Sequence, residues 1–194
     1  MNYEPEVFRT QFPIVKWFVY HLTYYRALSS GCREHRLQNE FWTLTINAHL
    51  LRATIDWCMV FGSDKSNPTH WKRLFITESE ALYQSFREGL FKATGLDRDT
   101  WQQYWESMTD FRNKYAAHRE LEQFTSPVPN FDTALAVAYY YDNWVRRLIS
   151  PDTFAEPTLE SFALSLQKSV VPLVKKLLEV TGELAEPNAA GDAR

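Results

Sequence analysis

The chain has 194 residues, of which 45% are hydrophobic, 15% aromatic and 23% charged, and its formal net charge is −3. This composition is sufficient for the core of one domain, and the negative charge excludes a protein covered with basic residues for non-specific nucleic-acid binding. Two cysteines, Cys32 and Cys58, are too few for a disulfide framework. Apolar stretches are interrupted within about 10 residues, whereas a membrane span needs ~20. We therefore expect a cytoplasmic protein with no membrane segment.

Two long helices are predicted in the first third of the chain. The first covers about residues 6–28, contains Pro13, and is expected to end at Ser29-Ser30-Gly31 with Gly31 as its C-terminal cap. The second covers about residues 36–61. One apolar stripe, with the three- and four-residue steps typical of a helix that packs on a core, runs along this second helix: Phe41, Leu44, Ala48, Leu51, Ile55 and Cys58.

Turn and capping signals divide the middle of the chain. Residues 62–64 (Gly-Ser-Asp) begin a polar loop, and Trp71 with Leu74-Phe75 is expected to anchor that loop to the body. Residues 77–80 (Thr-Glu-Ser-Glu) resemble a capping box, so we expect a third helix from there to Gly95. Asp99 with Gln102 is the predicted cap of a fourth helix, which runs from Trp101 into residues 109–122.

The last third is predicted to hold two further helices. Residues 123–130 form a proline-containing loop, and Asn130 can cap a fifth helix. Residues 150–151 (Ser-Pro) begin another loop, and a final helix starts near Thr158 and is expected to kink or break at Pro172. No convincing alternating strand pattern is found. We expect an all-α, single-domain bundle of five to six helices over residues 1–181 and a disordered tail over 182–194. The many aromatic residues fit either a dimer interface or a large core.

The sequence TDFRNKYAAHRELE, residues 109–122, places Arg112 and His118 on the fourth helix. His118 continues an apolar three-four repeat, and Arg112 lies one position beside it, next to Trp105. On one straight helix the two residues are ~120° apart and ~9 Å apart along the axis, so they cannot both point directly at one phosphate. The small residues 116 and 117 (Ala-Ala) would let a two-fold-related helix approach closely. Two Arg and His pairs would then line a shared groove.

Such a groove has the chemistry for cleaving RNA. A neutral histidine can take the proton of a ribose 2′-hydroxyl or return a proton to the leaving oxygen. Arg112 offers a planar set of donors to the phosphate oxygens as negative charge develops, and Asn113 can orient the phosphate or the catalytic side chains. Because the 2′-hydroxyl is the nucleophile, this chemistry uses no metal and leaves a 2′,3′-cyclic phosphate. We therefore predict no metal site and no cofactor.

The stretch RNKYAAH, residues 112–118, resembles the R-x(4–6)-H motif, with a polar residue after the Arg, of the HEPN superfamily. Members of this superfamily are all-α, commonly dimeric, and many are metal-independent ribonucleases of toxin–antitoxin and abortive-infection systems. The resemblance implies that Arg112 and His118 are catalytic and that Asn113 supports them. Neighbouring Lys114, Tyr115 and Arg119 are the predicted substrate-binding residues. The whole chain is most similar to the abortive-infection branch, with RNA, a second copy and an antitoxin or other protein as the expected partners.

One position departs from a branch of that superfamily. Toxins that are silenced by nucleotidylation have a tyrosine two residues after the histidine, where this chain has Glu120. We therefore do not expect that regulation here.

Two alternatives stay open beside the ribonuclease. The first is a non-catalytic helical module that binds RNA or a protein. The second is a structural dimer with His118 in its core. The other histidines lie on separate segments without zinc-ligand spacing. Lys65, Lys72 and Arg73, with His70 and Trp71, form a basic and aromatic cluster that suits either a nucleic-acid contact or a solvated loop anchored by one tryptophan.

Overall fold

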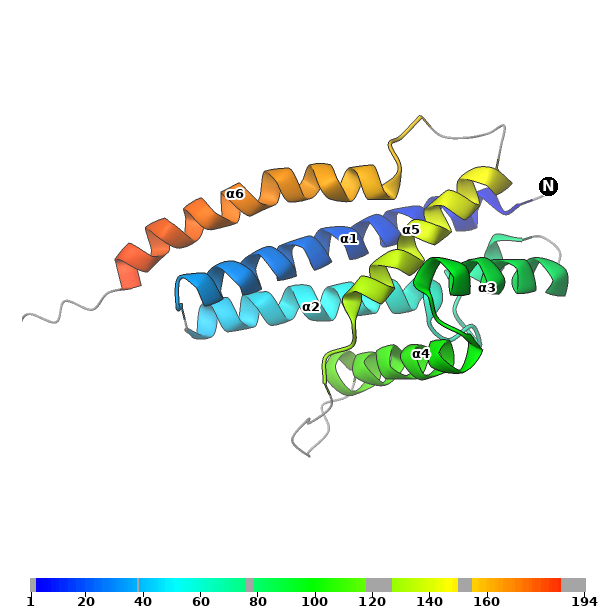
Figure 1. Ribbon diagram of the computed structural model, residues 1–194, viewed down its shortest axis with the longest axis horizontal. Helices are drawn as coiled ribbons and strands as arrows, with labels where there is room; N and C mark the ends of the chain where they lie inside the picture. Colours follow the sequence, from blue (N-terminus) through cyan, green and yellow to red (C-terminus); the bar gives the residue numbers. More distant parts are fainter. Residues whose placement is uncertain (1–2, 38, 76–78, 118–126, 150–154, 186–194) are drawn as a thin grey trace, which may run out of the picture.

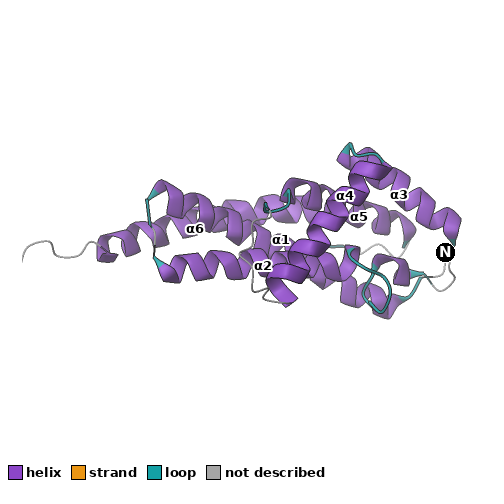
Figure 2. Cartoon of the chain, turned by 90° about the horizontal axis from the view of Figure 1, so that it is seen from below, coloured by secondary structure: helices purple, strands orange, loops and turns teal. Residues whose placement is uncertain are grey.

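The computed structural model describes residues 3–37, 39–75, 79–117, 127–149 and 155–185. These residues form six α-helices with a short 3₁₀ helix and a π-helical turn, so the predicted all-α bundle of about six helices is confirmed. The molecule is elongated: α3, α4 and α5 gather around one end of the long α1–α2 pair, and the C-terminal half of α6 extends to the other end (Figures 1 and 2). No helix in the described ranges is long and apolar enough to cross a membrane.

The hairpin of α1 (Pro5–Glu34) and α2 (Glu40–Phe61) is the axis of the fold. The prediction that Gly31 ends the first helix is wrong, because α1 continues to Glu34 and Gly31 is buried inside it. A Cβ atom at Gly31 would lie 2.4 Å from Leu178 Cδ1, so the glycine permits close packing of α6 on α1. The left-handed backbone that reverses the chain falls instead on Arg36, at φ 53°. Asn39 caps α2 by accepting a hydrogen bond from the Trp42 amide.

Of the predicted stripe on α2, only Cys58 is buried in the core. The N-terminal half of the stripe faces outward, with Phe41 66% and Leu44 61% exposed, while Leu51 and Ile55 are half-buried. We call these residues with Ala48 the α2 outer face. The core instead receives a second apolar set from the opposite side of the helix: Trp42, Leu50, Ala53, Trp57, Val60 and Phe61. Because α2 is apolar on two sides, its sequence pattern does not identify the side that packs inward.

The loop after α2 is anchored as predicted, with Trp71, Leu74 and Phe75 buried; Trp71 and Leu74 bound the 3₁₀ helix η1 (Trp71–Leu74). His70 stabilises this loop from within. The Gln11 amide donates to the His70 carbonyl at 2.8 Å, and the Tyr141 hydroxyl donates to Gln11 Oε1 at 2.5 Å. The loop is therefore tied to α1 and, through α1, to α5.

Capping residues define α3 (Glu80–Thr94) and α4 (Arg98–Arg112). Gly95 ends α3 at φ 71°, as predicted. Ser79 caps α3 by accepting a hydrogen bond from the Leu82 amide, whereas the first two residues of the predicted capping box, 77 and 78, lie outside the described residues. The predicted Asp99 and Gln102 cap is wrong by two residues. Asp97 accepts a hydrogen bond from the Thr100 amide, and the Thr100 hydroxyl accepts one from the Asp97 amide, so α4 starts at Arg98.

The helix α5 (Phe131–Leu148) begins at the predicted Asn130 cap and crosses α1 and α2 diagonally (Figure 1). Its buried Asp142 accepts hydrogen bonds from Arg146 and from the Leu159 amide, which fixes the start of α6 (Leu159–Ala185). The expected break at Pro172 is absent, because α6 is one helix through that residue. Residues 182–185, assigned to the tail by prediction, belong to α6, while 186–194 lie outside the described residues. The predicted loop at residues 150–151 also lies outside them.

Candidate functional site

Arg112 is the last residue of α4 and lies half-buried at the contact between α4 and α2. Its Nε atom is buried and has no hydrogen-bond partner in the part of the chain that the structure describes. Buried N–H groups are nearly always hydrogen-bonded in folded proteins, so an unpartnered one at a polar side chain needs a functional or structural explanation. A bound anion would supply the missing acceptor.

The neighbour of Arg112 on α2 is Cys58. Burial raises the pKa of the Cys58 thiol to about 12, and the positive charge of Arg112 opposes that rise. Cys58 Sγ lies 3.8 Å from the Met108 carbonyl of α4, which places the thiol at the same interhelical contact. Because the thiol stays protonated at neutral pH, it cannot act as a counter-ion for Arg112.

The chain changes geometry directly after Arg112. Asn113 is exposed and begins the π-helical turn η2 (Asn113–Ala117), where the hydrogen-bond register departs from that of an α-helix. Lys114 is half-buried, and Tyr115 is 46% exposed with its ring stacked on Phe111 at 4.7 Å between centroids. Short π-helical insertions occur frequently at functional sites. Three of the predicted site residues therefore follow Arg112 on an irregular, partly exposed turn.

The other two predicted site residues, His118 and Arg119, lie outside the described residues, as does Glu120. The described range that contains α4 and η2 ends at Ala117, the residue before His118. The role of His118 therefore stays a prediction from the motif. The straight-helix geometry used for that prediction does not hold between the two motif residues, since η2 replaces the α-helix after Arg112.

The turn η2 contacts α2, the helix that also carries the α2 outer face. Phe41 and Leu44 expose large apolar side chains near the start of that helix, about 21–26 Å along its axis from Cys58, the neighbour of Arg112. Leu51 and Ile55 lie closer to Cys58 and are partly exposed. Exposed apolar surface on a protein commonly marks an interaction site.

Sequence spacing missed one polar cluster between α1 and α2. His21 and His49, 28 residues apart in sequence, share a hydrogen bond between their Nδ1 atoms at 2.9 Å, and Tyr24 stacks on His49. Burial lowers the pKa of both imidazoles, and for His21 the charges of His49 and Arg52 lower it further. Arg52 pairs with the buried Asp56 at 2.9 Å. Asp56 Oδ1 is nevertheless buried without a hydrogen-bond partner among the described residues. The His21–His49 pair could be found only by knowing the register of the hairpin.

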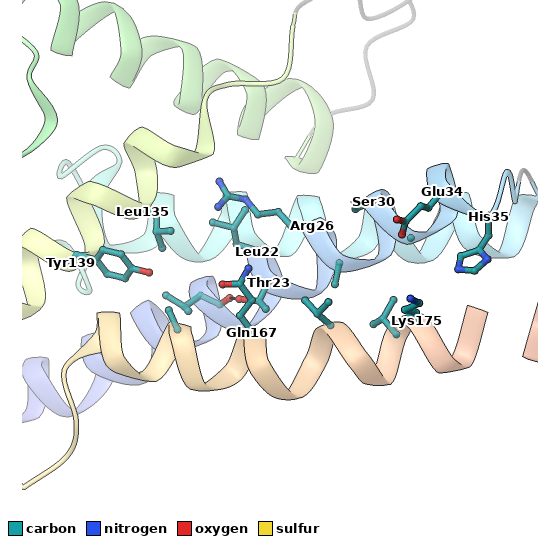
Figure 3. A pocket seen from close by; sticks show the side chains of 16 residues that line it. Leu22, Thr23, Arg26, Ser30, Glu34, His35, Leu135, Tyr139, Gln167 and Lys175 are labelled. Atoms are coloured by element: carbon teal, nitrogen blue, oxygen red, sulfur yellow. Dashed lines mark hydrogen bonds between the residues drawn. The ribbon is translucent and has the colours of Figure 1, made fainter. Parts of the chain in front are cut away.

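A cavity with a volume of about 430 Å³ lies between α1, α5 and α6 (Figure 3). Arg26 and Gln167 lie around its middle, Tyr139 lies at one end, and Glu34, His35 and Lys175 lie toward the other end. Arg26 is already paired with the exposed Asp132 at 2.6 Å. Arg26 and Lys175 are the cations of the lining and Glu34 is its carboxylate, so little net charge is left for a ligand once Arg26 is paired with Asp132.

A second cavity, of about 350 Å³, lies between the loop after α2, η1, α3 and α4, and we call it the α3–α4 cavity. The buried rings of Phe61 and Phe86 contribute to its lining, together with the half-buried indoles of Trp101 and Trp105. The basic and aromatic cluster predicted from the sequence is divided here. Lys65 and Lys72 line the cavity, whereas Arg73 does not.

Within the described ranges, no three His, Cys, Asp or Glu side chains come together as ligands for a metal ion. Comparison of the chain with protein-family models, with curated proteins and with solved structures found no match. The chemistry of the site is therefore inferred from its residues alone.

Proposed function

We propose that the protein is a metal-independent endoribonuclease of the HEPN type, which acts as a homodimer in a defence or toxin–antitoxin system. The observation that carries the proposal is the buried, unpartnered Nε of Arg112 at the end of α4. A guanidinium with unused donors fits a phosphate group, which can accept two hydrogen bonds from it at once.

In the proposed reaction, His118 removes the proton from a ribose 2′-hydroxyl, and the resulting oxygen attacks the adjacent phosphorus. The bond from phosphorus to the 5′-oxygen breaks, and that oxygen receives a proton from an imidazolium. The products are a 2′,3′-cyclic phosphate and a 5′-hydroxyl. Arg112 binds the non-bridging oxygens and stabilises their negative charge in the transition state, and the exposed amide of Asn113 orients the phosphate.

The α2 outer face supports the dimeric form of the proposal. Two copies related by a two-fold axis would bury Phe41 and Leu44 against each other, since a two-fold interface uses the same patch on both subunits. The part of the face formed by Leu51 and Ile55 would extend the interface toward η2, which contacts α2, and the Arg112 and His118 pairs of both subunits are proposed to share one groove. Lys114, Tyr115 and Arg119 are proposed to contact the RNA strand there.

The α2 outer face equally favours a second candidate, a non-catalytic helical module that binds RNA or a protein through the same surface. RNA incubation in the presence of EDTA separates the two candidates. The ribonuclease predicts wild-type cleavage with 2′,3′-cyclic phosphate ends and at least ~10²-fold slower cleavage by Arg112→Ala. Intact RNA with the wild-type protein under all salt and pH conditions tried would leave the binding module.

A further inference from the structure

The α3–α4 cavity has an excess of positive charge. Of the described residues that line it, Lys65, Lys72 and Arg87 are cationic and Asp64 is the single carboxylate. His70 also lines it, but burial lowers the pKa of this imidazole to about 4, so it is neutral at pH 7. The three cations come from the loop, η1 and α3, and they therefore converge from separate elements.

The cations are available to a ligand to different degrees. Lys72 is bound to Asp64 at 2.6 Å. Arg87 pairs at 2.9 Å with Glu80, which is well exposed and does not line the cavity, so this pair is weak. Lys65 is exposed and has no ion-pair partner within the described ranges. An incoming anion can therefore bind Lys65 without breaking an ion pair, and Arg87 by breaking only a weak one.

Aromatic rings complete the cavity. The Trp105 indole is held in place because its Nε1–H donates to the Phe61 carbonyl at 2.9 Å, and Trp101 packs beside Trp57. Gln102 adds an exposed amide with two donors and one acceptor at the edge. A flat aromatic group fits against the indoles, and the amide can hydrogen-bond to it. Cations beside rigid tryptophans are the combination that binds single-stranded nucleic acids.

The size of the cavity narrows the class of ligand. A volume of about 350 Å³ lies at the lower end of the range for small-molecule sites. Two turns of a helix about 10 Å in diameter occupy roughly 850 Å³, so the cavity does not hold a helical peptide. One nucleotide is a better fit in size, shape and charge.

The cavity is also aligned with the candidate active site. Trp105 and Arg112 are both on α4 and seven residues apart, which places them on the same side of the helix and ~10.5 Å apart along its axis. A bound strand of a few nucleotides spans this distance. Within the described chain, α4 therefore connects an aromatic, cationic cavity at one end with an unpartnered guanidinium at the other.

We propose that the α3–α4 cavity is a nucleotide subsite for the RNA substrate. It holds one unpaired base against Trp101 and Trp105 and the adjoining phosphate between Lys65 and Arg87. The inference rests on the proposed function in taking RNA as the ligand. It differs from it in location, since the subsite binds the strand and takes no part in the cleavage step.

The test uses the full chain and a fluorescein-labelled 2′-O-methyl RNA of about 12 nucleotides, which cannot be cleaved, with binding followed by anisotropy at several salt concentrations. We expect Lys65→Ala and Arg87→Ala each to weaken binding about tenfold. Each should also reduce the steepness of log Kobs against log[salt] by ~0.7, the effect of losing one phosphate contact on a single strand. Lys92→Ala is the matched control, since Lys92 is an exposed cation on α3 outside the cavity.

Two results would overturn the subsite: wild-type protein that does not bind the probe, or Lys65→Ala and Arg87→Ala proteins that bind it as tightly as Lys92→Ala does. Thermal melting checks that each variant is folded. The cleavage assay separates this inference from the proposed function. If Arg112→Ala abolishes cleavage while Lys65→Ala and Arg87→Ala leave RNA binding unchanged, the subsite alone is wrong. If RNA binding depends on Lys65 and Arg87 but the wild-type protein cleaves no RNA, the proposed ribonuclease activity alone is wrong.

Discussion

Arg112 and Cys58 meet where the end of α4 contacts α2, and the arginine there faces a protonated thiol instead of a carboxylate. Arginines that serve only stability are usually paired when they are partly buried. Arg112 forms no ion pair with any residue that the structure describes, and its buried Nε has no acceptor. The Arg112 side chain therefore keeps a buried donor for which the described residues provide no acceptor.

Replacing Arg112 should therefore leave the fold intact. Because Arg112→Met keeps the apolar stem and removes the unpartnered donor, we expect the free energy of unfolding to stay the same or rise by about 1 kcal/mol. Urea denaturation measures this, with Arg147→Met on the exposed end of α5 as the control. A loss of several kcal/mol in Arg112→Met alone would show that the guanidinium is a structural group.

A charge on the α2 outer face should separate the proposed dimer. We expect Leu44→Asp to convert the protein to a monomer without lowering its helix content, since Leu44 is 61% exposed within the single chain. Leu173→Asp on α6 is the matched control, because Leu173 is 60% exposed and lies away from the α2 outer face. Sedimentation equilibrium measures the mass. Wild-type protein that is monomeric at all concentrations would contradict the shared groove.

The stability of the protein should fall in acid because of His70. Burial, the largest cause, lowers its folded pKa to about 4 from an ordinary value of 6.5, with Lys72 and Arg73 contributing and Asp64 opposing. The unfolded chain therefore binds a proton that the folded chain excludes, and stability is full above pH 6.5 and decreases as the pH falls toward 4. Linkage gives a loss of about 2.5 kcal/mol at pH 4.5. The lowered pKa values of His21 and His49 act in the same direction.

Urea denaturation at pH 7.0, 6.0, 5.0 and 4.5 measures this dependence. His70→Gln should be less stable than wild type at pH 7 and should lose less stability on acidification. An equal loss in both proteins would assign the effect to other groups.

The buried ion pair of α5 should matter far more than the exposed one. Asp142 is buried and accepts hydrogen bonds from Arg146 and from the first amide of α6, so Asp142→Ala removes the carboxylate beside the Arg146 guanidinium and the acceptor of the Leu159 amide. We expect a loss of about 3–5 kcal/mol. Asp132→Ala removes the exposed partner of Arg26 and should cost about 1 kcal/mol or less. Equal losses in thermal or urea unfolding would be inconsistent with the burial of Asp142.

Local signals in the sequence predicted the helices well. Gly95 and Asn130 act on backbone groups a few residues away, and both of these caps were predicted correctly. Asp97 and Asp99 both lie near the start of α4, and either could cap the helix. Asp97 is the cap because the Thr100 hydroxyl completes a capping box with it. Gly31 was misassigned because its small size serves packing against Leu178, a residue of a helix far along the chain.

Contacts between helices that are far apart in the chain could not be predicted from the sequence. α2 is apolar on two opposite sides, and only the positions of α1 and α5 determine that Trp57 is buried and Phe41 is exposed. The His21–His49 pair depends on the length of α1, which the early stop at Gly31 would have changed. Of the candidate site, the sequence predicted Arg112 and its neighbours from a motif, whereas the burial of Nε and the π-helical turn required the structure.

The most direct test of the central claim is RNA cleavage in EDTA by wild type, His118→Ala and Arg112→Ala at matched dimer content, with the product ends identified. We predict cleavage by the wild type that leaves 2′,3′-cyclic phosphate and 5′-hydroxyl ends, reduced at least ~10²-fold in each variant. Wild-type cleavage that persists at the same rate in both variants, or that leaves 3′-hydroxyl ends, would contradict the assignment of Arg112 and His118 as the catalytic residues.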